Sequence, residues 1–131
     1  MPQIGKEEIQ IVTKVLKSHI LTGRVGSGPM ATQFEKNFTK FAKAKHAIAV
    51  NNGTAALHMA ALTAKIEKGD EVILPSFTFV ATAEVIVWAG AKPVFADIEP
   101  DTYTISPKAI RKAVTKKTKA IMPVDLYGLP A

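Results

Sequence analysis

Short apolar segments alternate with helical segments from His46 to the end of the chain, and this alternation limits the possible folds more than any other feature. We expect strands at 46–51, 71–74, 93–96 and 119–124, with helices at 54–65, 78–89 and 107–114 between them. The strands are apolar on both faces and rich in Val and Ile, which is typical of a parallel sheet covered by helices on both sides. The sequence therefore predicts an α/β fold with a mainly parallel sheet.

Two helices are expected before the sheet region. Apolar residues repeat at three- and four-residue spacing over 7–18, and a second helix is expected over about 30–44. One face of that second helix carries an aromatic stripe, which we expect to be buried: Phe34, Phe38 and Phe41. We therefore divide the chain into an N-terminal helical segment, 1–45, and a sheet region, 46–131.

The composition excludes several classes of protein. The absence of cysteine excludes disulfides, thiolate chemistry and cysteine zinc sites, and no metal site is expected. The first residues are polar and acidic, unlike a signal peptide, and no window reaches the ~18 apolar residues that span a bilayer, so we expect a cytoplasmic protein with no membrane partner. The basic stretch 108–119 lacks stacking aromatic residues, so we interpret it as a solvated helix face and expect no nucleic-acid partner.

The loop Asn51-Asn52-Gly53-Thr54 connects the first expected strand to a helix. Unpaired N–H groups and the positive end of the helix dipole make such a helix start suitable for an anion, although a start capped by Asn52 or Thr54 is the alternative. Right-handed crossovers would bring this loop, residues 75–77, Asp97 and Asp125 to one edge of the sheet, where open α/β sheets bind ligands. The pattern favours a site for a phosphate-bearing ligand.

Several segments, taken in register, resemble the start of the large domain of the DegT/StrS-type sugar aminotransferases. They are Gly69-Asp70-Glu71-Val72-Ile73-Leu74-Pro75, Ser76-Phe77-Thr78-Phe79-Val80-Ala81-Thr82, and the stretches 90–97 and 118–128, and the resemblance also includes 4–9, 27–29 and 34–35. These enzymes use pyridoxal 5'-phosphate (PLP) and have the aspartate-aminotransferase fold. The resemblance covers essentially the whole chain, but a domain of this family is much longer, so we expect 1–131 to be an incomplete PLP-binding large domain.

The resemblance implies roles for several residues. Gly53, Thr54 and Ala55 would hold the cofactor phosphate through backbone N–H groups and a hydroxyl. Phe79 falls where the family has an aromatic ring that stacks on the pyridine ring, with Phe77 as the competing candidate. Phe79 could instead point into the core if it begins the helix 78–89, and Trp88, deep in that helix, is expected in the core.

Other polar candidates have a purely structural alternative. A carboxylate at Asp97 or Asp125 could bind a sugar hydroxyl or orient the cofactor, or it could close an Asx-turn. We favour the turn for Asp97 and leave both interpretations open for Asp125. Arg24, in a glycine-rich loop, could contact a substrate phosphate or be solvated, and His58 is expected to pack.

The resemblance also implies a reaction. The complete protein would transfer an amino group, from glutamate as donor, to a keto group on a nucleotide-linked sugar, and would work as a homodimer. That chemistry needs a lysine that forms an imine with the cofactor and an acid beside the pyridine nitrogen. The family places both after Leu126-Tyr127-Gly128, so we identify no catalytic residue here. A PLP-dependent sugar dehydratase, a module that only binds phosphorylated ligands, and a non-catalytic truncated or regulatory fragment remain alternatives.

Overall fold

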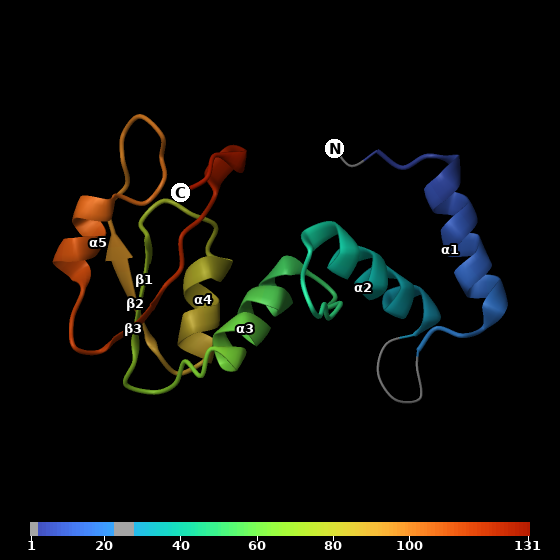
Figure 1. The fold of residues 1–131 in the computed structure, drawn as a ribbon, viewed down its shortest axis with the longest axis horizontal. Helices are drawn as coiled ribbons and strands as arrows, with labels where there is room; N and C mark the ends of the chain where they lie inside the picture. Colours follow the sequence, from blue (N-terminus) through green and yellow to red (C-terminus); the bar gives the residue numbers. More distant parts are fainter. Residues whose placement is uncertain (1–2, 23–27) are drawn as a thin grey trace. The chain divides into compact units, whose positions relative to one another are not determined.

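The computed structural model describes residues 3–22 and 28–131, and the chain separates into two compact units, Met1–Val50 and Asn51–Ala131 (Figure 1). Arg24, which was predicted to contact a substrate phosphate or solvent, lies outside the described residues.

The first unit contains the helices α1 (Lys6–Ser18) and α2 (Pro29–Ala42). The N–H group of Gly5 donates to the Glu8 carboxylate at 2.7 Å, which closes the start of α1 and lowers the pKa of Glu8. Neither helix has a buried residue, so the expectation of a buried aromatic stripe on α2 is wrong for this chain. The three rings instead contact one another along a single helix face, with centroids 5.8 and 6.3 Å apart, rather than packing under a second element.

The strand predicted at 46–51 is also absent. Residues 46–50 form no strand, and the side chain of Ile48 is 77% exposed. A strand needs a neighbour that pairs with its backbone, and no strand in the described part of the chain pairs with this segment. The N–H group of Ala49 donates instead to the Glu35 carboxylate at 2.8 Å.

The second unit is built on a sheet of three parallel strands, in the order β2-β1-β3. The strands are β1 (Glu71–Pro75), β2 (Lys92–Ala96) and β3 (Thr118–Ile121). The central strand β1 is buried along its whole length, whereas β2 and β3, each paired on one side in the described residues, are partly exposed. The predicted parallel α/β sheet is confirmed.

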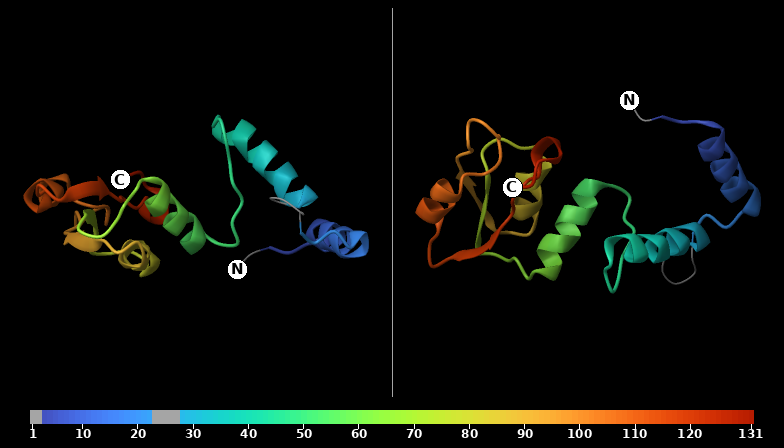
Figure 2. Two further views of the ribbon diagram at one scale, coloured as in Figure 1. Left: turned by 90° about the horizontal axis from the view of Figure 1, so that it is seen from below. Right: turned by 45° about the horizontal axis from the view of Figure 1, so that its top comes forward.

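Helices cover both faces of this sheet (Figures 1 and 2). On one face, α3 (Gly53–Thr63) and α4 (Ala81–Trp88) pack around Val72. On the other face, α5 (Pro107–Ala113) packs around Ile73. Adjacent residues of β1 therefore anchor two separate cores, as a strand with apolar residues on both faces requires.

Two details of α4 differ from expectation. The helix begins at Ala81 rather than at 78, so Phe79 lies in the loop before it. Trp88 is the last residue of α4 and is 56% exposed, so its predicted core position is wrong. A ring at the end of so short a helix extends past the core, and here it makes an edge contact with His58, with centroids 5.6 Å apart. No helix in the described residues is long and apolar enough to cross a membrane.

Candidate functional site

The carboxyl edge of the sheet is where the predicted site segments leave the fold. Because the three strands are parallel, the segments that follow Pro75, Ala96 and Ile121 all start at this edge. Figure 1 shows α3 descending toward the end of the sheet at which β1 begins, so the N-terminus of α3 points in the same direction as the carboxyl ends of the strands. The topology thus orients the helix start and the loop after β1 toward one side of the second unit.

The N-terminus of α3 combines a cap with free donors. The Asn52 side chain accepts a hydrogen bond from the Ala55 N–H at 2.8 Å, and the Asn52 carbonyl accepts one from the Ala56 N–H at 3.1 Å. Within the described residues, the N–H groups of Gly53 and Thr54 and the Thr54 hydroxyl have no hydrogen-bond partner. A Cβ atom built on Gly53 would meet nothing within 4 Å, so the space beside these donors is open. The capping alternative is therefore real, but it occupies only the Ala55 donor.

Phe79 presents a free aromatic ring beside the sheet edge. Its side chain is 74% exposed, so it does not point into the core. Phe77, the competing candidate, packs against Tyr103 with ring centroids 5.8 Å apart and planes inclined by 47°. Phe79 is therefore the more exposed of the two rings, and its exposed face suits stacking on a flat ligand.

The two aspartates at this edge both make local hydrogen bonds. The Asp97 carboxylate accepts from the Ile98 N–H at 2.9 Å, and its carbonyl accepts from the Ser106 N–H at 2.9 Å, as expected of a turn residue. The Asp125 carboxylate accepts from the Ala131 N–H at 2.9 Å and so closes the loop that contains the short 3-10 helix η1 (Leu126–Gly128). A contact of Asp125 with ligand stays a prediction.

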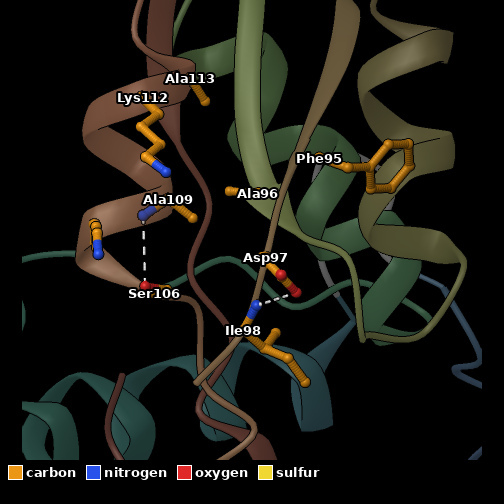
Figure 3. A pocket seen from close by; sticks show the side chains of 9 residues that line it. Phe95, Ala96, Asp97, Ile98, Ser106, Ala109, Lys112 and Ala113 are labelled. Carbon is orange, nitrogen blue, oxygen red and sulfur yellow. Dashed lines mark hydrogen bonds between the residues drawn. The ribbon is translucent and has the colours of Figure 1, made fainter. Parts of the chain in front are cut away.

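An open pocket of about 440 Å³, which was not predicted from the sequence, lies between the end of β2 and α5 (Figure 3). The side chains between the strand and the helix are small, at Ala96, Ala109 and Ala113, which leaves the space unfilled. The facing alanines are the signal that could have identified it. Neither Phe79 nor the N-terminus of α3 lines this pocket, so it is separate from the predicted cofactor site.

The charged groups of the described residues include neither a buried lysine nor a cluster suited to a metal ion. Every lysine of the chain lies in the described residues and is exposed. No cluster of His, Asp and Glu suited to a metal ion occurs in the parts that the structure describes. The buried carboxylate of Glu71 lies at the amino edge of the sheet, where hydrogen bonds from Thr115 and Lys92 lower its pKa. Its position indicates a structural role.

Comparison with known proteins relates this site to a family. Residues 2–131 match the model of the DegT/DnrJ/EryC1/StrS aminotransferase family. The spore coat polysaccharide biosynthesis protein SpsC of Bacillus subtilis (strain 168) is 50% identical over 128 residues, which are 98% of this chain and 32% of that protein.

Solved structures of aminotransferases are also similar to this chain. The aminotransferase from Psychrobacter cryohalolentis is 40% identical, with a TM-score of 0.91 over 98% of this chain and 32% of its own. The Spr1654 protein of Streptococcus pneumoniae, in its PLP-form, is 34% identical, with a TM-score of 0.91 over 99% of this chain and 32% of its own. The chain spans about a third of the length of these relatives. A family match over nearly every residue, together with the same arrangement of strands and helices, means that the chain belongs to the DegT/DnrJ/EryC1/StrS aminotransferase family.

Proposed function

We propose that the protein binds PLP, with the phosphate at the N-terminus of α3 and the pyridine ring on Phe79. The observation that carries this proposal is the pair of unpartnered N–H groups at Gly53 and Thr54, which adjoin open space at the positive end of a helix. A phosphate dianion needs several fixed donors, and the Thr54 hydroxyl adds one more. The exposed ring of Phe79 supplies the apolar face that a flat heterocycle needs. The residues therefore fit the cofactor present in the solved relative.

In this proposal the residues of the chain bind and orient the cofactor. The helix start fixes the phosphate, and Phe79 restricts the tilt of the ring, which is the positioning that such catalysis requires. When bound, PLP supplies an electron sink for chemistry at the carbon that carries the amino group. Every lysine of this chain is exposed, with no burial that would lower its pKa for covalent attachment, so the proposal assigns no catalytic residue among them.

We infer further that the complete protein transfers an amino group from glutamate to a keto group on a nucleotide-linked sugar, as a homodimer. The support is family membership and a relative named for polysaccharide biosynthesis. The reaction would yield an amino sugar and a 2-oxo acid, so nitrogen is conserved between donor and acceptor.

The experiment is a titration of the full-length protein with PLP, followed by incubation with glutamate and a panel of nucleotide-linked keto-sugars. Mass spectrometry should show a glutamate-dependent amino sugar. If the protein binds PLP but the sugar loses water and gains no amino group, the protein is a dehydratase and the proposed transferase activity is wrong. No PLP binding at all would refute the proposed cofactor site itself.

A further inference from the structure

The loop between β1 and α4, residues 76–80, is held by contacts to the sheet, to Tyr103 and to the first turn of α4, while the ring of Phe79 stays exposed. The Ser76 N–H donates to the Ala96 carbonyl at 2.8 Å, which continues the sheet one residue past the strand. Phe77 is anchored on Tyr103. Thr78 and Phe79 are both held by a single residue from the first turn of α4, and the Val80 carbonyl accepts from the N–H groups of Ala83 and Glu84.

That residue is Thr82. Its hydroxyl lies 2.9 Å from the Thr78 hydroxyl, and its N–H donates to the Phe79 carbonyl at 3.0 Å. Thr82 is only 5% exposed, so the core fixes its position. It therefore holds the residue before Phe79 by its side chain and Phe79 itself by its main chain.

We propose that Thr82 is a positioning residue, which presents the ring of Phe79 to the cofactor by means of its hydroxyl bond to Thr78. This inference rests on the proposed function, because it deepens the role of Phe79 in that site. The physical reason is preorganisation: when the backbone that carries the ring is already fixed, less conformational entropy is lost as the ring stacks on the ligand. The buried hydroxyl of Thr82 also needs a hydrogen-bond partner, and Thr78 supplies it.

The chain offers a matched control. Thr104 is 8% exposed, and its hydroxyl lies 2.8 Å from the Thr102 hydroxyl, in the loop that follows β2. This pair has the same chemistry and similar burial but does not hold Phe79. A Thr104→Val variant therefore reports the general cost of breaking a buried threonine pair.

The test measures PLP dissociation constants of the full-length protein, in the wild type and in a Phe79→Ala background. Replacing the hydroxyl in Thr82→Val should raise the dissociation constant by roughly 3- to 10-fold, the effect of one ordinary hydrogen bond. Thr82→Ser, which keeps the hydroxyl, and the control Thr104→Val should stay close to wild type. In the Phe79→Ala background, Thr82→Val should have no further effect, because the ring that it positions is gone. An equal effect in both backgrounds, or equal losses for Thr82→Ser and Thr82→Val, overturns the inference.

Hydrogen exchange of segment 76–84 in the cofactor-free protein tests the hydroxyl bond between Thr78 and Thr82 separately from PLP binding. Faster exchange in Thr82→Val and in Thr78→Val, whose residue is less buried than Thr82, supports the inference if Thr82→Ser exchanges as the wild type does. Unchanged exchange in both valine variants overturns it. If Thr82→Val fails to fold, Thr78→Val is read alone, and unchanged exchange in that variant overturns it. If the wild type does not bind PLP, the proposed function is refuted. The exchange result then still shows whether the bond between Thr78 and Thr82 holds the loop.

Discussion

The N–H group of Ala55 is the point at which helix capping and cofactor binding compete. It donates to the Asn52 side chain at 2.8 Å, yet the resemblance places Ala55 on the cofactor phosphate. If the phosphate uses this donor, it must displace the cap. The substitution Asn52→Ala should therefore lower the free energy of unfolding of the cofactor-free protein and lower its dissociation constant for PLP.

The size of both effects follows from the same hydrogen bond. Replacing an N-cap asparagine by alanine costs about 1 kcal/mol of stability. In the bound state of Asn52→Ala the phosphate takes over the free donor, so that cost is recovered on binding. By linkage, the dissociation constant for PLP should fall by up to about fivefold, the equivalent of 1 kcal/mol.

Two measurements on the full-length protein check this expectation. Urea unfolding of the cofactor-free form gives the change in free energy of unfolding, and absorbance titration gives the dissociation constant. Asn51→Ala is the matched control, because Asn51 is exposed and has no hydrogen bond in the structure. An unchanged dissociation constant in Asn52→Ala would show that the phosphate uses only Gly53 and Thr54. Weaker binding would show that the Asn52 side chain itself contacts the cofactor, and either result refutes the competition.

Three further expectations concern the site and the amino edge of the sheet. Thr54→Val should lose a hydrogen bond to a charged group, worth roughly 1.5–3 kcal/mol, so PLP affinity should fall by more than tenfold in a titration, whereas Thr54→Ser should stay near wild type. Phe79→Ala should weaken PLP binding with little change in thermal stability, and Phe77→Ala should do the opposite because its ring packs on Tyr103; exchanged behaviours would show that the stacking residue is misassigned. The pKa of Glu71 is lowered in the folded state, so its ionised form stabilises the protein above about pH 4.3 and this contribution is lost as the pH falls through the folded pKa. The difference in unfolding free energy between wild type and Glu71→Gln should therefore shrink from pH 7 to pH 3, and a difference independent of pH would contradict the reasoning.

The sheet and its covering helices could be predicted because their signals are local. Alternation of apolar strands with helices fixes the class, and the burial of both faces of β1 follows from its unbroken apolar run. The aromatic choice between Phe77 and Phe79 could not be decided from sequence, because it depends on a contact with Tyr103, which lies in a different loop.

The errors have a common cause. The strand at 46–51, the buried stripe of α2 and the buried position of Trp88 each assume that a neighbouring element covers the apolar residues. Periodicity shows which face of an element is apolar, but it does not show what packs against that face. The sequence allows capping and phosphate binding at the same helix start, and the structure shows the cap, from the Ala55 N–H to the Asn52 side chain.

The last expectation concerns the 131 residues produced by themselves. In the described residues, β2 and β3 each have one unpaired side, and Ile121 on β3 is half exposed. The apolar face of α2 is exposed as well, up to 85% at Phe41. Unpaired strand edges and apolar surface of this kind promote association between chains. We therefore expect light scattering to give a mass above that of a monomer, and we expect Ile121→Lys, which places a charge on the β3 edge, to reduce it. Because every lysine is exposed, borohydride reduction with PLP should give no adduct at one unique lysine. A cooperative, well-folded monomer would contradict the argument from the strand edge, and a single specific adduct would place a catalytic lysine within these residues.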